Sequence, residues 1–336
     1  MKLSWQQITL PALALGLLAF GAPHSANAQA SIKMDGSSTV FPIAEAVAEE
    51  FQISKRGKVR VTVGMSGTGG GFKKFCRGET DMSNASRPIL AEEMELCRKN
   101  SVKYIELPVA FDALTVVINP GNNWVKGNAM TVADLRKMWE PAAQGRISTW
   151  KQVRAEWPAE KLMLFGPGAD SGTFDYFTEA VTGKSKASRG DFTASEDDNV
   201  LVQGISRDVD ALGFFGFAYY AENRDKLRSL PISWKGGKAV GPSTETVVNG
   251  TYQPLSRPIF IYVSASAAKR PEVREFAEFY NRNAEKLVRE VKYVPLPAAA
   301  YNYNVDALAK NRVGTKFGGE NLVGVTIEQL MKLEAK

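Results

Sequence analysis

The sequence predicts an α/β protein with two lobes. Three times along the chain, a short apolar strand is followed by a turn of glycine and small hydroxyl residues and then by an amphipathic helix, which is the repeated unit of α/β folds. The 336 residues are enough for two domains at the usual size of roughly 150 residues each. Two further apolar strands can carry the chain from one lobe to the other.

The pattern of residues 1–28 is typical of a cleavable secretory signal, so the predicted fold begins at residue 29. Residues 1–28 contain a single charged residue, Lys2, then an apolar run over residues 10–20 and a small-residue ending at 26–28, in the order that is typical of signal peptides. The apolar run is shorter than the roughly 20 residues that a membrane span needs. We therefore expect the mature protein to be soluble and exported to the periplasm.

The first two strand-turn-helix units lie near the start of the mature chain. In the first, a strand over residues 31–34 leads through a turn at 35–39 into a helix with Pro42 in its first turn, where proline is tolerated. In the second, a β-branched strand over residues 59–63 leads through a glycine-rich turn at 64–71 into another helix. The apolar faces of the two helices are formed by Ile43, Ala46, Val47 and Phe51 and by Phe72 and Phe75.

A third unit follows in the middle of the chain. A strand over residues 162–165 leads through a turn at 166–173 into a helix. All three turns therefore present glycine and small hydroxyl side chains at a helix start. The apolar face of the third helix is formed by Phe174, Phe177 and Val181.

Two further strands, over residues 114–119 and 259–263, are candidates for the crossings between the lobes. A long amphipathic helix over residues 271–291 follows the second of them. On this assignment the first lobe is discontinuous and the second is an insert within it. The first lobe comprises residues 29–113 and 258–336, and the second comprises residues 114–257.

The composition excludes several classes of function. The only histidine, His24, lies inside the predicted signal, so the mature protein lacks the usual base of serine and cysteine hydrolases and the commonest metal ligand. The net charge of +6 is spread along the chain, without the dense basic block and interleaved aromatic residues that nucleic-acid binding requires. We expect a monomer with no catalytic residues, no metal, no cofactor and no nucleic-acid partner.

Cys76 and Cys97 are the only cysteines. An even pair in an exported protein usually forms a disulfide, which here would close a loop of about 20 residues and stabilise the fold by roughly 3 kcal/mol. Two buried free thiols and a metal site built from two cysteines are the alternatives, the second being the weaker because no histidine completes it. We predict a disulfide between Cys76 and Cys97.

The three turns predict an anion site. The first N-H groups of a helix have no partner within the helix, and the helix dipole adds a partial positive charge there, so converging helix starts would surround a small oxyanion. Serine or threonine before a helix is also an ordinary N-cap, so one such turn alone would be structural. Three turns rich in both glycine and hydroxyl groups favour a ligand of phosphate size. The second turn lacks the Gly-Lys-Ser/Thr ending of a P-loop and the dinucleotide spacing, which disfavours nucleotides.

Arg87 is the predicted cationic ligand. It stands between Ser86 and Pro88, where the chain would return to the edge of the cleft. A bidentate guanidinium is the natural partner of a phosphate dianion, and a solvated surface arginine is the alternative. We expect Arg87→Ala to weaken phosphate binding by on the order of a hundredfold, because charge-assisted bonds are worth roughly 1.5 to 3 kcal/mol each.

Four motifs resemble those of the periplasmic phosphate-binding proteins of the high-affinity phosphate ABC importer, most closely the branch first noted in cyanobacteria. They are DGSSTV at residues 35–40, SGTGGG at 66–71, NASRP at 84–88 and ADSGTF at 169–174, and the segments 195–199 and 213–220 agree with them. The resemblance covers the whole mature chain. It implies a type II periplasmic-binding-protein fold, in which two α/β lobes joined by two crossing strands enclose one phosphate ion and deliver it to the membrane permease of the importer.

The resemblance also implies a ligand set. In the best-studied branch an aspartate stands where this chain has Arg87; it accepts the proton of hydrogen phosphate and so rejects sulfate. An arginine stands there where this chain has Pro167, so in this chain the positive charge is expected to have moved across the cleft to Arg87. The proton acceptor of this chain is open among Asp170, Asp35 and Asp198. Together with Arg87, which follows from the residues themselves, the expected phosphate ligands are Ser38, Thr39, Val40, a hydroxyl of Ser66 or Thr68, Asp170, Ser171, Gly172 and Thr173.

Other functions stay open at this point. A receptor for another oxyanion, such as sulfate or a phosphonate, is the nearest alternative, and a surface sensor of phosphate without a transport role is another. A phosphatase with Ser171 or Ser66 as nucleophile is disfavoured, because no histidine is available as its base.

Overall fold

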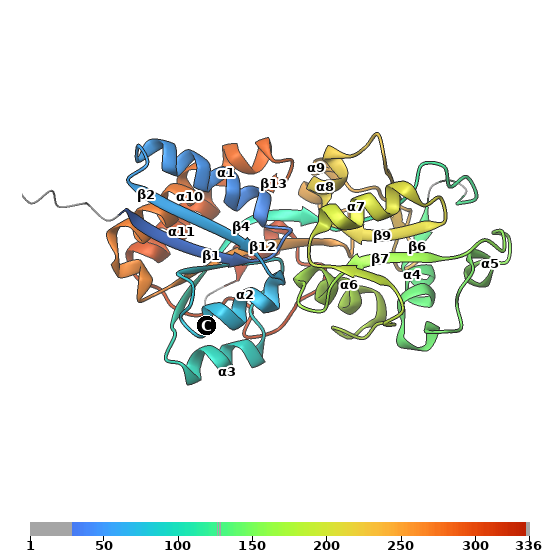
Figure 1. The fold of residues 1–336 in the computed structure, drawn as a ribbon, viewed down its shortest axis with the longest axis horizontal. Helices are drawn as coiled ribbons and strands as arrows, with labels where there is room; N and C mark the ends of the chain where they lie inside the picture. The colour runs from blue at the N-terminus through green and yellow to red at the C-terminus, as the bar shows by residue number, and fades with distance from the viewer. Residues whose placement is uncertain (1–28, 126, 128, 334–336) are drawn as a thin grey trace, which may run out of the picture.

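The computed structural model describes residues 29–125, 127 and 129–333. The predicted signal at residues 1–28 lies outside this part of the chain. Figure 1 shows two lobes side by side, one holding the N-terminal strands together with the helices α10 and α11, the other holding the middle of the chain. No helix within the described part is both long enough and apolar enough to cross a membrane.

The first lobe is built around a six-stranded sheet with the order β13-β4-β12-β3-β1-β2. β1 pairs in parallel with both β2 and β3, and β12 pairs antiparallel with β3 and β4. Helices α1 and α10 lie on one face of the sheet and α2 and α3 on the other (Figure 1). The elements of this lobe are β1 (Ala30–Gly36), α1 (Phe41–Ser54), β2 (Val59–Met65), α2 (Gly67–Phe75), β3 (Met82–Ala85), α3 (Ala91–Lys99), β4 (Tyr104–Ala113), β12 (Ser256–Ser264), α10 (Pro271–Glu290), β13 (Val294–Pro295) and α11 (Ala298–Ala309).

The second lobe is built around a five-stranded sheet with the order β10-β5-β9-β7-β8. β7 pairs in parallel with β8 and β9, and β5 pairs antiparallel with β9 and β10. Its elements are β5 (Thr115–Ile118), β6 (Met130–Thr131), α4 (Val132–Trp139), α5 (Trp150–Val153), β7 (Met163–Pro167), α6 (Gly172–Thr182), β8 (Thr193–Ser195), α7 (Asp198–Arg207), β9 (Ala211–Phe215), α8 (Phe217–Glu222), β10 (Arg228–Ser229), β11 (Ile232–Ser233) and α9 (Thr244–Val248), and the short helix α12 (Ile327–Lys332) comes near the end of the chain.

Two crossings join the lobes. β4 ends at Ala113 in the first sheet, and β5 begins two residues later in the second. The returning strand β12 pairs with β4 over its whole length, starting with Ser256 opposite Ala113. The predicted crossing strands are therefore present, and the first of them is preceded by the long strand β4, which the sequence pattern did not predict. The exact lobe boundaries at 113/114 and 257/258 stay a prediction.

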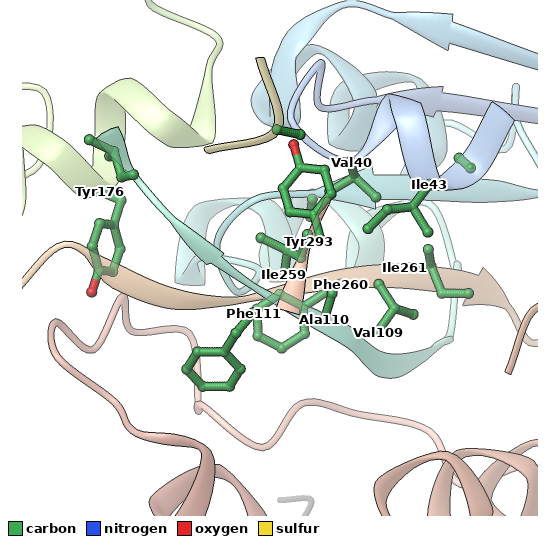
Figure 2. Packing of buried hydrophobic residues seen from close by; sticks show 14 of the residues in the cluster. Val40, Ile43, Val109, Ala110, Phe111, Tyr176, Ile259, Phe260, Ile261 and Tyr293 are labelled. Carbon is green, nitrogen blue, oxygen red and sulfur yellow. The ribbon is translucent and has the colours of Figure 1, made fainter. Parts of the chain in front are cut away.

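Buried apolar side chains anchor the start of α1 on the crossing strand. Figure 2 shows Val40 and Ile43 above Ile259 and Ile261 of β12, and all four are fully buried. Burying a side chain of this size contributes roughly 1.5–3 kcal/mol relative to leaving it exposed. The turn before α1 is thereby held in place by the element that connects the lobes.

The disulfide between Cys76 and Cys97 is present, which confirms that prediction. It joins the end of α2 to the last turn of α3, and both residues are buried. The alternatives of two free thiols and of a metal site at these cysteines are thereby excluded.

Candidate anion site between the two lobes

The turns before α1 and α6 meet across the cleft between the lobes. The hydroxyl oxygens of Thr39 and Thr173 lie 2.8 Å apart, although 134 residues separate them in the chain. Both side chains are buried. Two of the three predicted turns therefore come together from opposite lobes.

The start of α1 has free donors. Its N-cap residue is Val40, which has no side-chain oxygen to cap the helix, and Pro42 follows in the first turn. Among the described residues, nothing accepts the N-H groups of Ser38, Thr39 and Val40. The carbonyl groups of this turn are fixed from outside, since Tyr219 donates its hydroxyl to Ser38 O at 2.9 Å and Tyr293 donates to Thr39 O.

The start of α6 is capped by its own serine. Ser171 is the N-cap, and its hydroxyl accepts the N-H of Thr173 at 3.1 Å. The hydroxyl can still donate to another group, because a serine oxygen both donates and accepts. Ser171, Gly172 and Thr173 are all buried against the first lobe. The three residues therefore lie at the boundary between the lobes.

The glycine-rich turn contributes Thr68 rather than Ser66. Helix α2 begins at Gly67, so the glycines form its first turns. Thr68 Oγ1 is buried and lies 3.1 Å from Ser86 Oγ, whereas the half-buried Ser66 donates its hydroxyl to the carboxylate of Asp35.

One contact between the lobes requires a glycine. The N-H of Gly69 donates to Asp170 O of the second lobe at 2.7 Å. Gly67 has a φ of +72°, and a Cβ added there would lie 2.5 Å from the same carbonyl oxygen. The third turn therefore approaches the start of α2 this closely only because α2 begins with glycines.

The position of Arg87 corrects our expectation that it is the main cationic ligand. Its guanidinium is fully buried and donates to both carboxylate oxygens of Glu93 at 2.7 Å, to Asp175 at 2.6 Å and to Pro88 O at 3.0 Å. Burial lowers the pKa of Arg87, but Glu93 and Asp175 raise it further, so the group stays charged. One cation between two carboxylates offers an incoming anion no net attraction.

A second buried arginine, Arg257, lies at the start of α6. It is the second residue of β12 and donates to Thr173 Oγ1 at 2.7 Å and to Gly172 O at 3.1 Å. Its other contact is the carboxylate of Asp112, at 3.0 Å. Arg257 is absent from the ligand set that the sequence motifs predict. Arg257 therefore brings a positive charge directly to the helix start that carries Thr173.

The three candidate proton acceptors are placed very differently. Asp35 is bound by Ser66 and by Lys74 at 2.8 Å. The carboxylate of Asp170 faces the surface, where it pairs with Lys73 at 2.8 Å. Asp198 is fully buried, and neither of its carboxylate oxygens has a hydrogen-bond partner within the described structure.

This arrangement can bind a small oxyanion. It combines free backbone N-H groups, three buried threonine hydroxyls and one arginine, and these are the groups that bind phosphate and similar ions. The described residues include no histidine. They also include no cluster of side chains with the composition of a metal site.

Comparisons with known proteins agree with the geometry. Residues 21–283 match the model of the PBP superfamily domain. The chain is 54% identical over 328 residues to the protein SphX of Synechococcus elongatus, covering 97% of this chain and 96% of that protein. It is 35% identical over 305 residues to the phosphate-binding protein PstS of Staphylococcus saprophyticus, covering 88% and 92%.

Solved structures show the same fold. A possible phosphate-binding protein from Planctomyces limnophilus superposes with a TM-score of 0.62 at 48% identity, over 84% of this chain and 99% of that chain. A phosphate ABC transporter substrate-binding protein from Clostridium perfringens, determined with bound phosphate, superposes with a TM-score of 0.66 over 80% of this chain and 100% of that chain. At 21% identity the second match supports the fold alone. The expected two-lobed periplasmic-binding fold is confirmed.

Proposed function

Because the chain belongs to the PBP superfamily and, within it, to the family of SphX and PstS phosphate-binding proteins, we propose that it captures one inorganic phosphate ion between its lobes and delivers it to the membrane permease of an ABC-type importer. The observation that carries this proposal is the meeting of Thr39 and Thr173 across the cleft, with Arg257 on the second of them. The protein acts as a monomer in the periplasm and catalyses no reaction.

The proposed phosphate ligands come from both lobes. The first lobe supplies the N-H groups of Ser38, Thr39 and Val40 and the hydroxyl of Thr68. The second lobe supplies the start of α6, and β12 supplies the charge of Arg257. Relative to the sequence-based set, Arg257 replaces Arg87, Thr68 is chosen over Ser66, and the carboxylate of Asp170 is left out. The set is therefore Ser38, Thr39, Val40, Thr68, Ser171, Gly172, Thr173 and Arg257.

The charge of a phosphate dianion would be stabilised mainly by helix dipoles. Arg257 is paired with Asp112, so the pair adds little net charge. The starts of α1, α2 and α6 each carry about half a positive charge from the helix dipole, and the N-H groups of Ser38, Thr39 and Val40 have no acceptor among the described residues. A site of this kind binds a small anion tightly only when the lobes close and exclude water, because the dipoles act more strongly in a low dielectric.

Titration of phosphate-free protein tests the proposal. We expect millimolar phosphate to raise the melting temperature, since a ligand at a thousand times its dissociation constant stabilises the native state by about 4 kcal/mol, and to reduce the small-angle scattering radius as the lobes close. Sodium chloride of equal ionic strength serves as the control. If neither the melting temperature nor the scattering radius changes when phosphate is added, the proposal is refuted.

Two side experiments separate the alternatives. Calorimetric titration with phosphonate and with sulfate decides whether phosphate is the preferred oxyanion. Incubation with a chromogenic phosphate monoester checks the phosphatase alternative, and we expect no turnover above that of buffer.

A further inference from the structure

Two buried tyrosine hydroxyls donate to carbonyl groups of the turn before α1. Tyr219 donates to Ser38 O at 2.9 Å, and Tyr293 donates to Thr39 O at 2.6 Å. The N-H groups of the residues that follow these carbonyls, Thr39 and Val40, have no acceptor among the described residues. Because one planar peptide group joins each carbonyl to the N-H of the next residue, each tyrosine is bonded to the peptide group of one proposed phosphate donor.

Pro42 explains why one of these carbonyls needs a donor from outside. In a regular helix Ser38 O would accept the N-H of the residue four positions later, but at that position Pro42 has no N-H to give. The N-H of Phe41 is shared between Ser37 O at 3.1 Å and Ser38 O at 3.2 Å. Tyr219 therefore supplies the hydrogen bond to Ser38 O that its own helix cannot supply in full.

The two tyrosines come from different lobes. Tyr219 lies on α8 and belongs to a core cluster of second-lobe side chains, and 181 residues separate it from Ser38. Tyr293 directly precedes β13 in the first lobe and lies beside Val40 (Figure 2). Separation of the lobes would therefore break the bond of Tyr219 to Ser38 O and leave the bond of Tyr293 to Thr39 O in place.

Burial keeps both hydroxyls in the form that donates. It raises the pKa of Tyr219 and of Tyr293 well above the ordinary value, and the carboxylates of Asp198 and Asp112 raise the pKa of the two hydroxyls further. Within the described part of the chain, neither hydroxyl makes another hydrogen bond. The polar contribution of both side chains is thus directed to the turn before α1.

We infer that Tyr219 and Tyr293 are positioning residues of the anion site, which fix and polarise the peptide groups whose N-H groups, on Thr39 and Val40, bind the phosphate ion. This inference rests on the proposed function. Hydrogen bonds in a chain polarise one another in a low dielectric, so a peptide group whose carbonyl accepts a bond is a stronger N-H donor. The two bonds also orient both N-H groups before the ion arrives, which lowers the cost of ordering them on binding. Because Tyr219 belongs to the second lobe, the donor on Thr39 reaches its full strength only when the lobes are closed.

Variants with phenylalanine remove each hydroxyl and keep each ring. We expect Tyr219→Phe and Tyr293→Phe each to bind phosphate about tenfold more weakly in calorimetric titrations, as the loss of one buried hydrogen bond implies. Tyr301→Phe is the matched control, because its buried hydroxyl donates to Val109 O of β4 at 2.9 Å and accepts the N-H of Leu296. The control should lower the melting temperature of the ligand-free protein at least as much as the other two variants and keep the parent's phosphate affinity.

Amide resonances in the phosphate complex give a readout that a merely structural role would not move. Loss of a bond to a carbonyl makes the N-H of the same peptide group less polarised, so its proton and nitrogen resonances should shift upfield. We expect Tyr219→Phe to shift the resonances of Thr39. We expect Tyr293→Phe to shift those of Val40, and Tyr301→Phe to shift neither.

The outcomes separate this inference from the proposed function. The parent's phosphate affinity in either Tyr219→Phe or Tyr293→Phe would overturn the inference. A lower affinity with unchanged resonances of Thr39 and Val40 would also overturn it, because the tyrosines would then support only the packing of the lobes. A parent protein that shows no phosphate binding would overturn the proposed function, and the inference with it.

Discussion

Two arginines are buried at the cleft, and their partners give them different roles. Arg87 lies between Glu93 of the first lobe and Asp175 of the second. Removing it would leave two carboxylates buried without a cation, and breaking a pair of this kind costs about 3–5 kcal/mol. Arg87 therefore stabilises the contact between the two lobes and does not serve as the positive charge that attracts the anion.

Arg257 is the residue whose replacement should reduce phosphate affinity most directly. We expect Arg257→Lys, which keeps the charge but loses the forked donors on Thr173 and Gly172, to bind phosphate about tenfold more weakly, as the loss of one charge-assisted bond implies. Arg257→Ala should lose on the order of a hundredfold, together with stability, because Asp112 is left unpaired. Calorimetric titration of the two variants measures the series.

Arg274→Lys is the control for this series. Arg274 lies on α10 and donates to Leu308 O, far in the chain from the three turns, so its variant should keep the parent's affinity. If Arg257→Lys binds phosphate as the parent does, Arg257 is a structural partner of Asp112 only, and the dipoles of the helix starts supply the attraction.

Arg257 lies outside the four motifs, yet the sequence around it indicates a buried pair. Asp112 directly follows the apolar run at residues 107–111, and Arg257 directly precedes the apolar run at 258–263. A charge beside such a run needs an opposite partner when it is buried. The register of β4 and β12 places the two residues directly opposite each other. An acidic and a basic residue at matching positions of the two crossing strands thus predict a buried pair at the junction of the lobes. The pairing itself depends on a register that no local pattern gives.

At the level of helices and strands, the three strand-turn-helix units were predicted well and their ends less so. The strands at the start of each unit are present as β1, β2 and β7. Helix α2 begins inside the glycine run, at Gly67, because its packing against β1 and β3 outweighs the low helix propensity of glycine. On α1 the buried stripe includes Ala44 and Ala48, while Ala46 is only half-buried. Alanine fits either side of a helix, so periodicity alone cannot assign it.

The disulfide should stabilise the pair of helices α2 and α3. It closes a loop across 21 residues of sequence, and a cross-link of this length is worth about 3 kcal/mol by restricting the unfolded chain. We expect the double variant Cys76→Ser, Cys97→Ser to lose about that much free energy of unfolding in denaturant titrations and to bind phosphate with nearly the parent's affinity while folded. The oxidised state of the exported parent is checked by labelling unfolded, unreduced protein, where two reactive thiols would contradict the structure.

In the whole molecule, bonds between the lobes run along the cleft. Thr39 meets Thr173 at 2.8 Å, Gly69 donates to Asp170 at 2.7 Å, and Arg87 donates to Asp175 at 2.6 Å. Each pair joins a residue of the first lobe to the segment that contains the start of α6. The closed packing therefore depends on how near that helix start can approach the first lobe.

Gly172 sets this distance, and a methyl group there should act as a wedge. A Cβ on Gly172 would lie 2.5 Å from Thr68 Oγ1, 2.8 Å from Ser86 Oγ and 3.0 Å from Arg87 Cγ, all in the first lobe. The backbone at Gly172 is helical, so alanine brings no strain of its own and the separate lobes should fold normally. Overpacking costs about 1–3 kcal/mol, which corresponds to a loss of phosphate affinity of roughly tenfold to a hundredfold.

Small-angle scattering and calorimetry together test the wedge. With saturating phosphate, we expect Gly172→Ala to keep a larger scattering radius than the parent, because the helix start cannot reach Thr68 and Ser86. Gly190→Ala is the matched control, since the nearest atom to a Cβ there is Gln144 Oε1 at an ordinary contact distance of 3.5 Å. Equal radii and equal affinities for Gly172→Ala and the parent would mean that the lobes bind phosphate without this close approach, and that the contacts of α6 with the first lobe are not part of the binding step.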